Sequence, residues 1–177
     1  MLARRLLIRT GLLAAVAAVL EGCGFQPVYG QRDDGQSPVE KLAEIEVALL
    51  DGRNGQVMRQ ALQRRLEGAH SSAAKLYDLT VNYNLSEEGV ALQRSDSHST
   101  RIRAFGTASW TLLARDASRT SLASGFARSG DGFNQFDNQD FYGDLAGEKL
   151  ALRVADQLAD QIAVALAGYF RGRGDAS

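Results

Sequence analysis

Cysteine and histidine are scarce in this chain. The 177 residues include one cysteine, Cys23, and two histidines, His70 and His98, which lie far apart in sequence. A lone thiol cannot build a disulfide framework, and neither HExxH nor CxxC is present to hold a metal ion. The sequence also lacks the GxSxG nucleophile motif and a correctly spaced phosphate loop. It therefore predicts no catalytic residues, no metal, no cofactor and no enzymatic activity.

Long apolar runs and an excess of one charge are also missing. The longest uncharged apolar stretch, Gly11 to Leu20, is too short to span a bilayer, and it follows Arg4, Arg5 and Arg9. A positive segment before a short apolar one predicts an export signal over residues 1–22. The formal charge of −1 becomes −3 without those residues, because they carry three arginines and one glutamate. We therefore expect no nucleic-acid partner.

The four residues Leu20-Glu21-Gly22-Cys23 follow the apolar run directly. They resemble a bacterial lipobox, although Glu21 stands where that motif has a small residue. The resemblance implies that Cys23 is acylated and becomes the first residue of the mature protein. More than one acyl chain would make the membrane anchor durable. The other interpretation is a buried structural cysteine behind an uncleaved helix.

The next residues, Gly24-Phe25-Gln26-Pro27-Val28-Tyr29-Gly30, resemble the opening of the lipopolysaccharide-assembly lipoprotein (LptE) family of the Gram-negative outer membrane. The resemblance implies an outer-membrane lipoprotein that lies on the periplasmic side, largely inside a β-barrel. Such a protein helps the barrel of the lipopolysaccharide (LPS) translocon to assemble and supports LPS insertion at the cell surface. In the lipoproteins that this chain resembles, an aspartate directly after the cysteine commonly retains the protein in the inner membrane. This chain has Gly24 there, which favours delivery to the outer membrane.

The remaining chain has the length of one domain. We expect a lipidated N-terminus and irregular tether over residues 23–40, a single α+β domain over 41–171 and a polar tail over 172–177. Period-two alternation predicts strands at 43–50, 76–85 and 102–112, and Leu122 and Phe126 indicate a weaker strand from 120 to about 129. Helical spacing predicts helices at about 54–67 and 148–170.

The element order is then β-α-β-β-β-α. It predicts two helices packed on one face of a four-stranded mixed sheet. Gly106 lies on the apolar side of its strand and indicates either close packing or a β-bulge there. The polar side of the strand at 76–85, with Asp78, Thr80, Asn82 and Asn84, is left to face a polar barrel wall. The segment 129–143 is expected to be a loop whose aromatic residues either fold onto the core or meet a partner.

Three arginines are the candidate binding residues. Arg101 and Arg103 point to the same side of an extended strand, roughly 7 Å apart, and Arg94 lies in the preceding polar segment. Guanidinium groups pair well with phosphate oxygens, so we hypothesise that this group binds the lipid A phosphates of LPS. The alternative is a solvated sheet face whose arginines promote solubility.

Two further functions are compatible with the sequence. An independent periplasmic lipid-binding lipoprotein would need no barrel partner and would have a sizeable apolar cavity between helices and sheet. A lipid-anchored hydrolase is the third class, and no residue supports it. The barrel-partner interpretation predicts a closed core instead.

Overall fold

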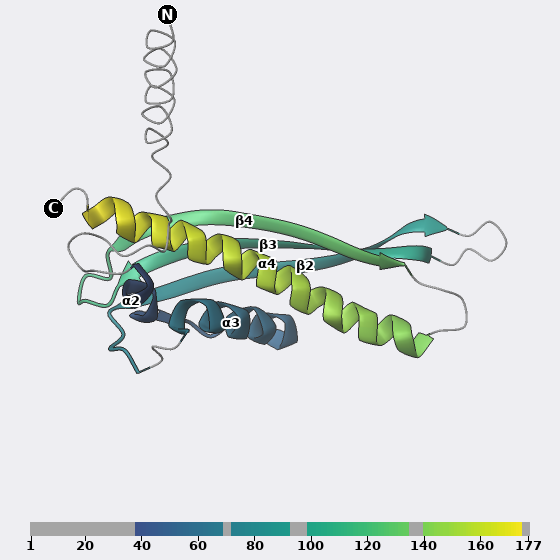
Figure 1. Cartoon of the computed structure of the whole chain (residues 1–177), viewed down its shortest axis with the longest axis horizontal. Helices are drawn as coiled ribbons and strands as arrows, with labels where there is room; N and C mark the ends of the chain where they lie inside the picture. The colour runs from purple at the N-terminus through teal and green to yellow at the C-terminus, as the bar shows by residue number, and fades with distance from the viewer. Residues whose placement is uncertain (1–37, 69–71, 93–98, 135–139, 175–177) are drawn as a thin grey trace, which may run out of the picture.

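Three helices and a four-stranded sheet make up the described part of the chain, which has an α+β fold (Figure 1). The computed structural model describes residues 38–68, 72–92, 99–134 and 140–174. Along the chain the elements are α2 (Pro38–Ala43), β1 (Ile45–Val47), α3 (Gly52–Glu67), β2 (Tyr77–Leu92), β3 (Ser99–Ala114), β4 (Ser121–Asn134) and α4 (Asp140–Gly174). The predicted fold class and its strand and helix order are confirmed, with α2 as an additional helix. Cys23, Arg94 and both histidines lie outside the described residues.

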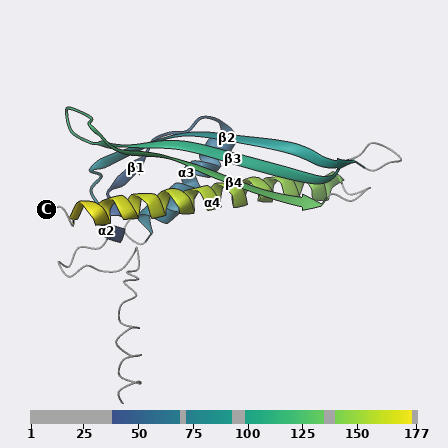
Figure 2. The ribbon, with the colours of Figure 1, turned by 90° about the horizontal axis from the view of Figure 1, so that it is seen from above.

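The sheet has the spatial order β1-β2-β3-β4. β1 pairs in parallel with the start of β2, whereas β2, β3 and β4 form a long antiparallel meander. The parallel pair is joined through α3, as a crossover connection requires. The three long strands have 16, 16 and 14 residues, so the meander extends well past β1 (Figure 2).

The core lies between one face of the sheet and the helices. Figure 2 shows α4 running along one side of the long strands. The sheet contributes alternate residues to this core, as the period-two pattern predicts, and α3 and α4 contribute residues at helical spacing. The largest fully buried side chains are those of Leu42, Ile45, Met58, Leu62, Leu66, Leu79, Leu112, Leu150, Leu158, Ile162, Leu166 and Val47.

Charged side chains connect the exposed margins of α3 and α4. Arg64 donates a 2.8 Å hydrogen bond to Asp156, and Arg65 is paired with Asp160. Each such exposed pair contributes only about 0–1 kcal/mol. Burial of the apolar faces therefore stabilises the helix pair, and the charges align it.

Several predicted boundaries are wrong. β1 ends at Val47, because the chain then turns towards α3 and leaves Leu49 86% exposed. The predicted tether ends earlier than residue 40, since Pro38 begins α2, a position where a missing N–H costs a helix nothing. α4 continues to Gly174, so residues 172–174 are helical and not part of a tail.

The predicted loop at 129–143 is largely regular structure. β4 continues to Asn134 and α4 begins at Asp140. Phe133, one of its aromatic residues, is half-buried against the core, in agreement with the first of the two interpretations. Glycines interrupt the apolar alternation in this stretch, so the sequence pattern does not indicate a strand there.

Candidate functional site: the open face of the sheet

The sheet face opposite the helices is polar and largely solvent-exposed in the described part of the chain. We call it the open face. The register of β2 and β3 decides which side chains are neighbours on this face: Asn82 lies opposite Ser109, and Asn84 lies opposite Thr107. Most of these side chains are short and carry hydroxyl or amide groups: Thr80, Asn82, Asn84, Ser86, Thr107, Ser109, Thr111 and Ser124. A face of this kind can hydrogen-bond to a partner without a large loss of side-chain entropy.

The sequence analysis expected four β2 side chains on this face to be available to a partner. In the structure they differ in whether they are already bonded to other residues. Asn82 and Asn84 are exposed, and their amides carry no side-chain hydrogen bond to another described residue. Thr80 donates to the carbonyl of Thr111 at 3.2 Å. Asp78 is engaged by two guanidinium groups, Arg115 at 3.3 Å and Arg119 at 3.2 Å. Only the two asparagines are therefore free to meet a partner.

Two aromatic residues project from the open face. Phe126 of β4 is 65% exposed and lies opposite Ser109, and Phe105 of β3 is 38% exposed. Phe105 lies across Gly130, where an added Cβ would come within 2.9 Å of its ring. Exposed phenylalanine on a polar sheet is a typical anchor of a protein interface.

The orientation of Phe126 is a finding of the structure. With Leu122 it indicated the fourth strand, which is present, and the structure shows that it points away from the core. The core side of β4 carries small residues instead, because the indole of Trp110 covers Gly125, where a Cβ would lie 2.6 Å from the ring. The neighbouring core position is the buried Ala127. A strand with small inward residues lacks the alternation that would have shown its orientation.

Two of the three predicted binding arginines lie together. Arg101 and Arg103 are exposed and share the open face at the far end of the sheet. Arg101 donates a 3.2 Å hydrogen bond to the side-chain oxygen of Asn134, and the Arg103 stem lies next to Gly132. Arg128, which the sequence analysis did not single out, is exposed on the same face, opposite Thr107. The face thus carries three exposed arginines, of which Arg101 is held by a hydrogen bond.

The described residues show no cluster suited to catalysis or metal binding. No group of three or more His, Cys, Asp or Glu side chains in them could hold a metal ion. Burial raises the pKa of Tyr83 to about 12, so this phenol stays protonated. Asp131 has a lowered pKa, first because Arg153 donates a hydrogen bond to it, and it lies outside the open face. No described helix is long and apolar enough to cross a membrane.

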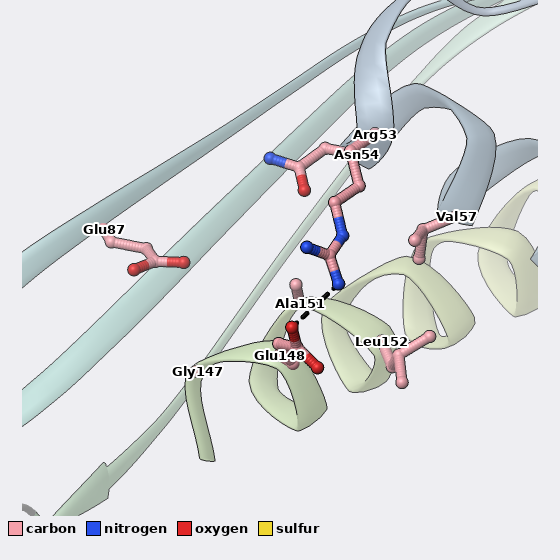
Figure 3. A pocket seen from close by; sticks show the side chains of 8 residues that line it. All are labelled: Arg53, Asn54, Val57, Glu87, Gly147, Glu148, Ala151 and Leu152. Atoms are coloured by element: carbon pink, nitrogen blue, oxygen red, sulfur yellow. Dashed lines mark hydrogen bonds and ion pairs between the residues drawn. The ribbon is translucent and has the colours of Figure 1, made fainter. Parts of the chain in front are cut away.

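A second feature is a surface cleft on the helix side. It measures about 240 Å³ and lies where α3 begins, between α4 and β2. In Figure 3 the amide of Asn54 and the carboxylate of Glu87 face the gap, whereas Arg53 reaches down to Glu148. Its other lining residues are small or apolar: Val57, Gly147, Ala151 and Leu152.

Comparison with known proteins shows the fold. Neither a protein-family model nor a curated protein sequence matches the chain. A candidate lipoprotein from Caulobacter crescentus superposes with a TM-score of 0.62 at 24% identity, over 77% of this chain and 98% of that one. Rare lipoprotein B from Shewanella oneidensis superposes with a TM-score of 0.53 at 9% identity, over 73% of this chain and 96% of that one.

A third solved structure is similar in the same way. Lipoprotein B from Nitrosomonas europaea gives a TM-score of 0.52 at 16% identity, over 72% of this chain and 82% of that one. The chain therefore shares its fold with bacterial lipoproteins. The family that its N-terminal motif resembles remains a prediction, because fold similarity at this identity does not carry function.

Proposed function

We propose that this protein is an outer-membrane lipoprotein, anchored through Cys23, that partners the β-barrel of the LPS translocon and assists its assembly and the insertion of LPS. The observation that carries the proposal is the open face, a long, polar sheet surface with two projecting phenylalanines and no described helix against it. Similarity in fold to bacterial lipoproteins supports the anchored state.

The chemistry of the open face supports a place against the inner wall of a barrel. Interior positions of outer-membrane barrels are polar, so a partner inside one needs hydrogen-bonding side chains and not an apolar surface. Asn82, Asn84 and Ser109 provide them, with water available to bridge imperfect contacts. Phe126 would fill an indentation in the wall and fix the orientation of the sheet.

Direct LPS binding belongs to the same proposal. Arg101 and Arg103 share one side of β3, and Arg94 precedes that strand in sequence. Guanidinium groups held in this way suit the phosphates of lipid A, and Phe105 on the same side suits its apolar part. Replacing Arg101 and Arg103 with glutamate should abolish LPS binding in vitro, whereas Arg64→Glu on α3 should leave it unchanged. Equal binding by both variants would refute the LPS site.

The barrel partnership is tested by affinity purification of the tagged chain from outer membranes. Mass spectrometry should show a stoichiometric barrel protein and a diacylated or triacylated Cys23 peptide. A photo-crosslinker at Asn82 or Ser109 should trap barrel residues that face the lumen, and one at Ala165, exposed on α4, serves as a matched control. Purification of an acylated chain without any barrel would contradict the proposal.

The second candidate is an independent periplasmic lipid-binding lipoprotein. It requires an apolar cavity between sheet and helices, yet Leu79, Leu112 and Ile162 fill the centre of that layer with no exposed surface. The cleft at α3 opens at the surface and has charged residues at its margin. The packing of the described core favours the barrel partner over a lipid carrier.

A further inference from the structure

The two outer edges of the antiparallel meander differ in how they are protected. On β4, Gln161 of α4 donates a 3.2 Å hydrogen bond to the carbonyl of Arg128, and Arg153 binds Asp131 at 2.5 Å. The first contact occupies one edge carbonyl of β4, and the second places a charged side-chain pair beside the strand, so both discourage pairing with another strand. The opposite edge, on β2, is covered by β1 over only three residues, Tyr77 to Leu79.

One hydrogen bond shows which backbone N–H and C=O groups of β2 point away from β3, towards the β1 side. The N–H of Ala48 donates to the carbonyl of Leu79 at 3.0 Å, so Leu79 presents its backbone groups to the β1 side. Backbone direction in a strand repeats every second residue. The same edge beyond β1 therefore presents the N–H and C=O groups of Val81, Tyr83, Leu85 and Glu87. No backbone hydrogen bond from another described residue reaches them there.

The cleft lies beside this free edge. Glu87 belongs to both, and Asn54 faces it from the first turn of α3 (Figure 3). Arg53 is paired with Glu148 at 2.7 Å, and no described cation pairs with Glu87. These features favour an occupant that combines extended backbone for the edge, a small or apolar side chain for the cleft and a positive charge beside Glu87.

We propose that the β2 edge from Val81 to Glu87 is a docking site for an extended, basic segment of a partner protein, which adds a strand to the sheet. Strand addition of this kind obtains affinity from backbone hydrogen bonds and specificity from alternate side chains. The β2 strand of a second copy cannot supply the cation, because Tyr77–Leu92 contains no Lys or Arg. The inference does not depend on LPS transport. It does not depend on the open face either, because the cleft beside this edge lies on the helix side of the sheet.

The first test traps the occupant. A benzoylphenylalanine is introduced in place of Asn54 in the full chain in its native cells, with Ala165 on α4 as the control position. Irradiation should give an adduct at Asn54 only, and peptide mapping should place it on a segment of another protein that contains Lys or Arg. An adduct to a second copy, to residues 24–37 of the same chain or to lipid would overturn the proposed occupant, as would no adduct.

The second test asks whether backbone pairing is needed. Glu87→Pro and Glu87→Ala both remove the carboxylate, but only proline also removes the edge N–H, at a position where an edge strand tolerates it. The adduct should fall about tenfold further in Glu87→Pro than in Glu87→Ala. Glu87→Lys should reduce it as well, through repulsion of the basic segment. Equal adduct yield in the proline and alanine variants would refute strand addition.

A third measurement keeps the result interpretable if the proline variant is unstable. In the purified native chain, the amides of Val81, Tyr83 and Leu85 should exchange hydrogen quickly, whereas those of Asn82 and Asn84, bonded to β3, should exchange slowly. Uniform protection along β2 would show that the edge is already occupied within the isolated chain and would overturn the proposal. If the affinity purification from outer membranes recovered no barrel protein, the proposed function would fail. The results of these three tests would not change.

Discussion

A methyl group on Gly106 of β3 would lie 2.5 Å from Cγ1 of Val154 and 2.8 Å from Cδ1 of Leu158. The absence of a side chain at this point therefore allows α4 to rest directly on the sheet. The sequence analysis expected either close packing or a β-bulge at Gly106, and the structure shows close packing, with no register shift at this residue. Gly106 is therefore one of the residues that determine how closely α4 packs on the meander.

Gly106→Ala should destabilise the protein by about 1–3 kcal/mol, because the new methyl group must displace two buried side chains. Gly168→Ala is the matched control: an added Cβ there has no neighbour within 4 Å, and alanine favours the helix by up to about 1 kcal/mol. Urea unfolding of both variants measures the free energies. An equal effect of the two substitutions would contradict the close contact.

Leu62→Ala should cost about 2–5 kcal/mol, since Leu62 is fully buried between α3 and the rest of the core. Leu152→Ala, at a position that is 43% exposed on α4, should change the free energy of unfolding by less than about 0.5 kcal/mol. Thermal and denaturant unfolding would show the difference. A small effect at Leu62 would mean that α3 is not part of the cooperative core.

Asp131 gives a pH dependence of known sign. Arg153 and the N–H of Gly132 donate to its carboxylate and lower its pKa in the folded state. A lowered pKa stabilises the fold above the unfolded value of about 3.9, and this contribution is lost as pH falls through the folded value. Wild type should therefore exceed Asp131→Asn in stability near neutral pH, and the difference should shrink below about pH 5. A difference that is constant with pH would contradict the assignment.

Phe126→Thr should leave folding intact and weaken the partner interaction. The side chain is 65% exposed and threonine keeps the preference for a strand, so the free energy of unfolding should change by less than about 1 kcal/mol. Recovery of the barrel protein with the tagged chain should fall. Val164→Thr, on the helix side and 45% exposed, should retain full recovery. Loss of recovery in both variants would indicate a general defect and refute the role of the open face.

The arginine pair and the polar side of β2 were predictable because they depend on local geometry. Arg101 and Arg103 stand two residues apart in a strand, and alternation alone places them on one side. The same rule identified the polar positions at Asn82 and Asn84. Asp78, by contrast, was expected to be free, and only the folded chain shows that Arg115 and Arg119 engage it.

The sequence by itself determined the element order, the class of fold and the inward faces of β2, β3 and α4, because repeating apolar positions of period 2.0 or 3.6 dictate local structure and its buried side. Tertiary structure alone decided that β1 stops at Val47, that Phe126 points outward and that no other described strand pairs with the β2 edge beside the cleft at Glu87. Those features depend on contacts between distant segments, such as Trp110 over Gly125, which no local pattern encodes.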